Sequence, residues 1–184
     1  MEVEALREKI RAAGVIGAGG AGFPTHMKLA PNINTVLVNA SECEPLLYTD
    51  YTILKEHIGL VVSGAEEVAK ALGAGQVLLC MKKHTASRLH ISDGQGFGDF
   101  TQVKQLPDVY PMGDEVIMIY QALGRVVPPG QLPAKVGVVV INAETAYNIA
   151  HAVQDIPVTE KWVTIAGDIP APKVVTVPVH RNVR

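Results

Sequence analysis

The sequence predicts an α/β domain built around a mostly parallel β-sheet with flanking helices. Short apolar segments rich in β-branched residues alternate with segments whose apolar residues recur at helical spacing, an alternation typical of parallel sheets with helical crossovers. The 184-residue chain is 48% hydrophobic, which is enough for a core that needs no disulfide or metal. After Pro157 only strand patterns follow, which predicts either an edge hairpin or the start of a second, mainly β module.

The individual elements follow from local patterns. Helices are expected over residues 3–13, 51–72 and 84–91, from the turn at 110–115 to about 123, and from 142–145 to about 153. Strands are expected over residues 35–39, 76–81, 101–105, 136–141, 162–166 and 174–179. Gly73 and Gly124 are helix stop signals, and Cys80 should lie inside its strand as a small apolar residue. Residues 14–25 and 93–99 are loops rich in glycine, and residues 125–135 form an extended segment rich in proline.

Charge and cysteine content exclude several classes of function. The formal net charge is -2 and like charges form no block, which argues against nucleic acid as a partner because phosphate binding needs clustered basic residues. Two cysteines are too few for a disulfide framework or a cysteine-ligated cluster, and the histidines lack metal-ligand spacing, so no metal site is expected. No apolar run reaches the roughly 20 residues that cross a bilayer, and no leader peptide is evident. A soluble, cytoplasmic protein without membrane insertion is expected.

The glycine loop contains the pattern G-x-G-x-x-G at Gly17, Gly19 and Gly22, with Glu42 twenty residues beyond Gly22. An ordinary dinucleotide fingerprint needs a strand before the loop and a helix starting within it. Here a helix precedes the loop and Pro24 follows it, which disfavours that interpretation but leaves a plain NAD-binding domain as an alternative. Consecutive glycines still let backbone N–H groups approach a planar ring or a phosphate. A tight packing turn is the structural alternative.

Polar residues directly follow two of the expected strands, and a third polar segment, residues 110–115, leads into the helix that ends near residue 123. Residues 39–45 come directly after a buried strand, and residues 141–145 end another. Ligands of parallel α/β sheets bind beyond the carboxyl ends of the strands, so both segments are candidate sites. Each also has a purely structural interpretation. Residues 39–45 could be a solvated turn, Asn142 a helix N-cap, and the acids of 110–115 a complement to the helix dipole.

Taken together, the motifs resemble one family of flavin-binding domains. The matching segments are residues 17–25, Lys28, residues 39–45, 110–115 and 142–145. The family includes the NADH-oxidising subunit of respiratory complex I and the C subunit of the Rnf complex. The resemblance is closest to the Rnf-like branch, which also holds the cobalamin reductase of propanediol utilisation and proline-reductase-associated proteins. It covers residues from about 12 to 157 and implies a Rossmann-like fold with a glycine-rich N-terminal loop.

The resemblance implies non-covalent FMN as the cofactor and NADH as the electron donor. No catalytic side chain is expected, because the isoalloxazine itself carries the hydride chemistry. The residues expected at the flavin are Gly17, Gly19, Gly20, Lys28, Asn39, Ser41, Glu42, Tyr110, Gly113, Asp114, Asn142 and Thr145. Those expected near the nicotinamide nucleotide are Phe23, Glu44 and Glu115.

The resemblance also implies a division of the chain and a set of partners. Residues 1–157 would form the FMN-binding domain, and residues 158–184 would begin a truncated β-grasp module. Electrons would pass to an iron–sulfur or cobalamin protein, with any clusters on missing regions or partners, and the chain could lie at a membrane complex or inside a bacterial microcompartment. Ala18 and Ser41 replace the arginine and aspartate of the complex I branch, which agrees better with the Rnf-like branch. Residues 84–99 are short and glycine-rich compared with the family's helix, and the chain has no cysteine run for an iron–sulfur cluster. A scaffold that has lost its cofactor is therefore a second hypothesis.

Overall fold

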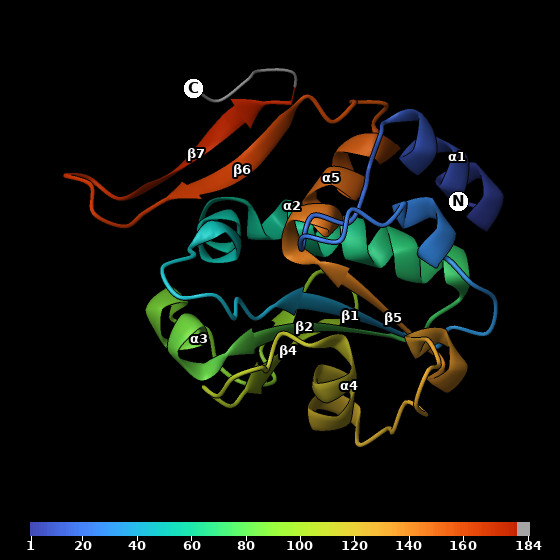
Figure 1. The fold of residues 1–184 in the computed structure, drawn as a ribbon. Coiled ribbons are helices and arrows are strands. Elements are labelled where there is room, and N and C mark those ends of the chain that lie inside the picture. The colour runs from blue at the N-terminus through green and yellow to red at the C-terminus, as the bar shows by residue number, and fades with distance from the viewer. Residues whose placement is uncertain (180–184) are drawn as a thin grey trace.

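The computed structural model describes residues 1–179 and confirms the mostly parallel sheet (Figure 1). The central sheet has five strands in the order β3-β4-β2-β1-β5. Its strands are β1 (Thr35–Ala40), β2 (Gln76–Lys82), β3 (Gly96–Phe97), β4 (Thr101–Leu106) and β5 (Val138–Asn142). All neighbours pair in parallel except β3, which runs antiparallel to β4 at the edge.

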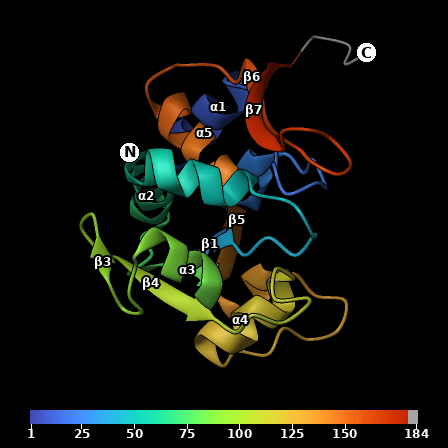
Figure 2. The same ribbon diagram turned by 90° about the vertical axis from the view of Figure 1, so that its left-hand side faces the viewer.

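Helices cover both faces of this sheet. They are α1 (Val3–Ala12), α2 (Thr49–Leu72), α3 (Lys83–Leu89), α4 (Glu115–Leu123) and α5 (Ala143–Val153), with short 3-10 helices η1 (Thr25–Lys28) and η2 (Pro133–Val136). Helices α1, α2 and α5 lie on one face and α4 on the other (Figures 1 and 2). No helix of the described residues is both long and apolar enough to span a lipid bilayer.

Alternate residues of each central strand fill two separate cores. In β1, Val36 and Val38 belong to the core under α1, α2 and α5, whereas Leu37 points to the core under α4. Successive side chains of a strand point to opposite faces, so a strand covered on both sides must be apolar throughout. Cys80 is fully buried within β2, as expected, and burial raises the pKa of its thiol to about 12.

The last two described strands, β6 (Glu160–Ile165) and β7 (Lys173–Pro178), form a separate antiparallel hairpin with Trp162 opposite Thr176. The hairpin lies beyond α2 and α5, on the side away from the sheet (Figure 1). After Pro157 the described residues form only these two strands, which agrees with the strand pattern expected there. The remainder of the predicted tail, residues 180–184, lies outside the described residues.

Three local expectations differ from the structure. The loop predicted over residues 93–99 contains the two-residue strand β3. The segment expected to be extended over residues 125–135 ends in η2, and β5 begins at Val138 rather than at residue 136. Gly137 separates η2 from β5 with φ +74, and a Cβ there would lie 2.8 Å from the Asn34 amide nitrogen, so the short helix has to end at this residue.

Candidate functional site

The polar segments that follow β1 and β5 meet at the carboxyl edge of the sheet. Asn39 of β1 is in register with Asn142 of β5, which places the two amides side by side. The glycine loop reaches the same edge, because the Ala18 N–H donates to Thr145 Oγ1 at 3.0 Å. The loop is closed by the Gly17 N–H, which donates to the Phe23 carbonyl at 2.8 Å. It is preceded by α1 and followed by η1, so the strand–loop–helix arrangement of a dinucleotide fingerprint is absent here.

Two adjoining cavities open between these segments, with volumes of about 290 and 690 Å³. Small-molecule sites commonly occupy roughly 300–1,000 Å³. The residues that line both cavities are Gly19, Asn39, Gly113, Asp114 and Asn142. Each of the fifteen residues expected at the flavin or the nicotinamide nucleotide lines at least one of the two cavities. The structure therefore brings the predicted set together, while the ligand assigned to each residue stays a prediction.

Asn39 joins the loop after β1 to the turn before α4. Its amide nitrogen donates to the Gly113 carbonyl at 2.8 Å, and its amide oxygen accepts from the Ser41 N–H at 3.0 Å. The Gly113 N–H in turn donates to Cys43 Sγ at 2.8 Å. A Cβ at Gly113 would lie 2.4 Å from the Ser41 carbonyl oxygen, so this close approach requires glycine.

Asn142 caps α5 and also binds a buried acid. Its amide oxygen accepts from the Glu144 N–H at 2.9 Å, which confirms the N-cap interpretation. Its amide nitrogen lies 3.0 and 3.1 Å from the two carboxylate oxygens of Asp50, near the start of α2. Asp50 lines the larger cavity, and burial together with the neighbouring Glu42 raises the pKa of its carboxyl to about 8. Burial thus favours the protonated form of the Asp50 carboxyl.

Glu42 faces the start of α2. One carboxylate oxygen accepts from the Asp50 N–H at 2.9 Å, and the Glu42 carbonyl accepts from the buried Lys82 ammonium at 2.8 Å. Burial raises the pKa of the Glu42 carboxyl, while backbone N–H groups of α2 and the charge of Lys82 oppose that rise. Glu42 thus accepts a hydrogen bond from the N-terminal turn of α2 and lines the larger cavity as well.

The smaller cavity contains an ion pair and an unpartnered hydroxyl. The Lys28 ammonium lies 2.8 Å from Glu115 Oε1 and donates to the Val140 carbonyl at 3.0 Å. Thr25 is 1% exposed, and its hydroxyl has no hydrogen-bond partner among the described residues. Phe23 lines the same cavity and is 42% exposed. Asp114 accepts from two N–H groups of the first turn of α4, as a capping acid does.

Several cavity residues were not anticipated from the sequence. Thr25 and Asp50 belong to this group, as do Lys161, Trp162 and Thr164 of β6. Asp50 had only one sequence signal, its position just after the turn at residues 39–45. The residues of β6 carry no local signal, because their place at the cavity depends on how the hairpin folds back onto α2 and α5.

Comparison with known proteins relates this arrangement to a family. Residues 10–151 match the Nuo51 FMN-binding domain. The chain is 42% identical over 185 residues to cobalamin reductase PduS of Salmonella typhimurium, covering 100% of this chain and 41% of that protein. It is 36% identical over 172 residues to one subunit of the proton-translocating ferredoxin:NAD(+) oxidoreductase complex of Clostridium ljungdahlii, covering 91% of this chain and 38% of that relative. The chain thus spans about two fifths of the length of these relatives.

The fold also matches that of a solved structure. An NAD+-reducing [NiFe]-hydrogenase in the H2-reduced state superimposes with a TM-score of 0.79 at 21% identity, covering 96% of this chain and 37% of that one. This likeness concerns the fold. The family match covers most of the chain, and it includes every residue that lines the two cavities except those of β6. The chain therefore belongs to the Nuo51 FMN-binding domain family, whose cofactor is FMN.

Proposed function

We propose that the residues around the two cavities bind a flavin mononucleotide. A Cβ added to Gly19 would meet only Asn142 Cβ, at 3.8 Å, and one added to Gly20 would meet nothing within 4 Å. The bare backbone of the loop therefore leaves room for a flat ring. The unpartnered Thr25 hydroxyl and the Lys28 ammonium offer hydrogen-bond donors from the protein, and a ligand with a phosphate and ribityl hydroxyls can accept from both.

We propose that this chain is the flavin-binding part of an oxidoreductase that takes electrons from NADH and passes them to an iron–sulfur or cobalamin acceptor. The observation that carries the proposal is the convergence of all fifteen predicted residues on two adjoining cavities in a member of an FMN-binding family. Bound FMN supplies the ability to take up a hydride and to release single electrons.

The protein's own groups bind and orient the ligands. The glycine loop and Asn39 define the floor of the site, and the Lys28 ammonium places positive charge beside an anionic ligand. Asn142 and Thr145 stand at the N-terminus of α5, where a phosphate is stabilised by the helix dipole. The half-exposed Phe23 ring offers an apolar face to the nicotinamide in the smaller cavity, which Glu115 also lines, and Glu44 contributes a carboxylate to the larger cavity.

The relatives support the proposed acceptors and location. One is named a cobalamin reductase, and another belongs to a ferredoxin:NAD(+) oxidoreductase complex. We therefore propose that the acceptor is carried by a partner or by a further part of a longer protein, and that the chain works at a membrane complex or in a microcompartment. We also propose that residues 158–184 begin a β-grasp module, which the hairpin of β6 and β7 supports.

The test is the visible absorption spectrum of the purified chain during titration with FMN, followed by anaerobic addition of NADH. A flavin band that binds in a one-to-one ratio and bleaches on addition of NADH is the expected result. A folded chain that binds no FMN would instead identify a scaffold without a cofactor. Binding of NAD without FMN would identify a plain nucleotide-binding domain.

A further inference from the structure

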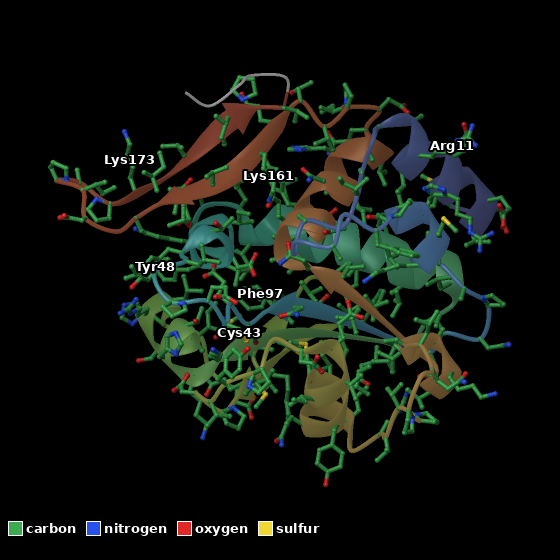
Figure 3. The ribbon with its side chains drawn as sticks, in the orientation of Figure 1. Arg11, Cys43, Tyr48, Phe97, Lys161 and Lys173 are labelled. Carbon is green, nitrogen blue, oxygen red and sulfur yellow. The ribbon has the colours of Figure 1, made fainter. Side chains whose placement is uncertain are left out.

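The β6–β7 hairpin forms one wall of the larger cavity. Lys161, Trp162, Val163 and Thr164 of β6 line this cavity together with Gly19 and Gly20 of the glycine loop. Figure 3 shows Lys161 between the hairpin and α5, whereas Lys173 lies on the outer strand β7. The hairpin and the α/β unit thus share one cavity.

A buried carboxylate holds β6 in this position. Glu144 lies in the first turn of α5, and its side chain is only 2% exposed. One of its oxygens pairs with the Lys161 ammonium, and the other accepts from the Trp162 N–H at 3.2 Å. A buried carboxylate without partners is costly. Both of these partners come from the hairpin, so β6 is tied to the helix whose N-cap lines the cavity.

Two side chains of the strand, those of Thr164 and Trp162, contact α2 and α5. Thr164 Oγ1 accepts from the Tyr48 N–H at 3.1 Å and lies 2.9 Å from Thr49 Oγ1. The Trp162 ring packs edge-on against Tyr147, with ring centroids 6.3 Å apart, and against His57 at 5.7 Å. The strand therefore contacts the α/β unit along its length, beside the cavity.

We propose that the hairpin closes the flavin site and that Glu144 is the positioning residue that holds it closed, through Lys161 and the Trp162 N–H. The inference rests on the proposed function, because the ligand enclosed is FMN. It adds a wall to the site that the sequence motifs do not include. Since a ligand enclosed on this side cannot leave freely while β6 is docked, Glu144 and Lys161 control how fast FMN dissociates.

The test compares FMN dissociation from the full 184-residue chain and from its variants, measured by the return of flavin fluorescence after dilution. Lys161→Met and Glu144→Gln should each accelerate dissociation at least tenfold, and Lys161→Arg, which keeps the charge, should stay within threefold of the parent. Trp162 is the single tryptophan, so its emission should shift to longer wavelength in the two fast variants. Lys161→Met keeps the test valid if Glu144→Gln fails to fold, because Lys161 is half-exposed.

Two matched controls separate closure of the site from general stability. Lys173→Met removes a lysine from the same hairpin outside the cavity and should leave dissociation unchanged. Glu66→Gln removes another buried carboxylate, which accepts from the Asp99 and Phe100 N–H groups beside β4 and lines neither cavity, and should lower stability without changing the dissociation rate. If the dissociation rate were unchanged in Lys161→Met and Glu144→Gln, the inference about the hairpin would be overturned and the proposed function would stand. A parent chain that binds no FMN would overturn the proposed function as well.

Discussion

Replacement of Gly19 separates binding of the flavin from stability of the fold. A Cβ at Gly19 would lie 3.8 Å from Asn142 Cβ, which is an ordinary van der Waals contact, and Gly19 lies outside the left-handed region. Gly19→Ala should therefore fold normally and even gain about 0.4–1 kcal/mol, because alanine restricts the unfolded chain. Gly19→Val should fold as well, with a larger side chain in the cavity.

The expected loss of affinity follows from the space that the methyl group takes. The added Cβ stands about 1.5 Å out from the backbone. When two contacting atoms move apart by only about 0.5–1 Å, they lose about a quarter to a half of their dispersion energy. A flat ring resting on this loop must retreat by about that distance. We expect at least a tenfold loss of FMN affinity for Gly19→Ala, about 1.4 kcal/mol, and a larger loss for Gly19→Val.

Two measurements test this reasoning. Titration with FMN, followed by quenching of flavin fluorescence, gives the affinity, and urea unfolding of the apoprotein gives the stability. Gly59→Ala is the matched control, because Gly59 is exposed on α2 with nothing within 4 Å of its added Cβ, and this variant should bind FMN like the parent. If Gly19→Val bound FMN within twofold of the parent, the flavin would not rest on this loop.

Three other substitutions test the fold, the buried acid and the nicotinamide site. Gly64→Ala places a Cβ 1.9 Å from the Ala146 carbonyl oxygen, so urea unfolding should show a loss of at least about 2 kcal/mol. The raised pKa of Asp50 means that the folded apoprotein keeps a proton that the unfolded chain releases above about pH 4. The free energy of unfolding should therefore fall by up to about 1.4 kcal/mol per pH unit as the pH rises from 4 to 8. Asp50→Asn should flatten this slope when unfolding is measured across that range. Phe23→Ala should slow flavin reduction by NADH in stopped-flow absorption without changing FMN affinity, and an unchanged rate would place the nicotinamide elsewhere.

The parallel strands could be predicted closely because both of their faces are buried. The runs at residues 35–39 and 76–81 are continuously apolar over residues 36–38 and 77–81, and the strands β1 and β2 extend each run by one residue. Strand β3 could not be predicted, because its two residues, Gly96 and Phe97, have no periodicity and pair only through their neighbour β4. Its existence depends on tertiary contacts.

The candidate site likewise contains residues that could be predicted from the sequence and residues that could not. Residues that follow strands, such as Asn39 and Asn142, could be placed at one edge from the order of elements alone, because the carboxyl ends of parallel strands share that edge. Asp50 and Glu144 could not, since an acid in the first turn of a helix ordinarily lies in solvent and complements the helix dipole. Their burial, at 7% and 1% exposure, depends on packing between distant elements.

Two buried helical carboxylates in this fold bind backbone N–H groups at or beside a strand that lies later in the chain. Glu66 of α2 accepts from the N–H groups of Asp99 and Phe100 just before β4, and Glu144 of α5 accepts from the Trp162 N–H within β6. The chemistry is the same, but only the second carboxylate, which anchors β6, adjoins the candidate flavin cavity. Since the hairpin contributes to both the anchor and the cavity wall, any change in the chain beyond residue 157 that moves β6 also changes the candidate flavin cavity. A partner that binds the hairpin and shifts β6 would therefore also change the shape of this cavity.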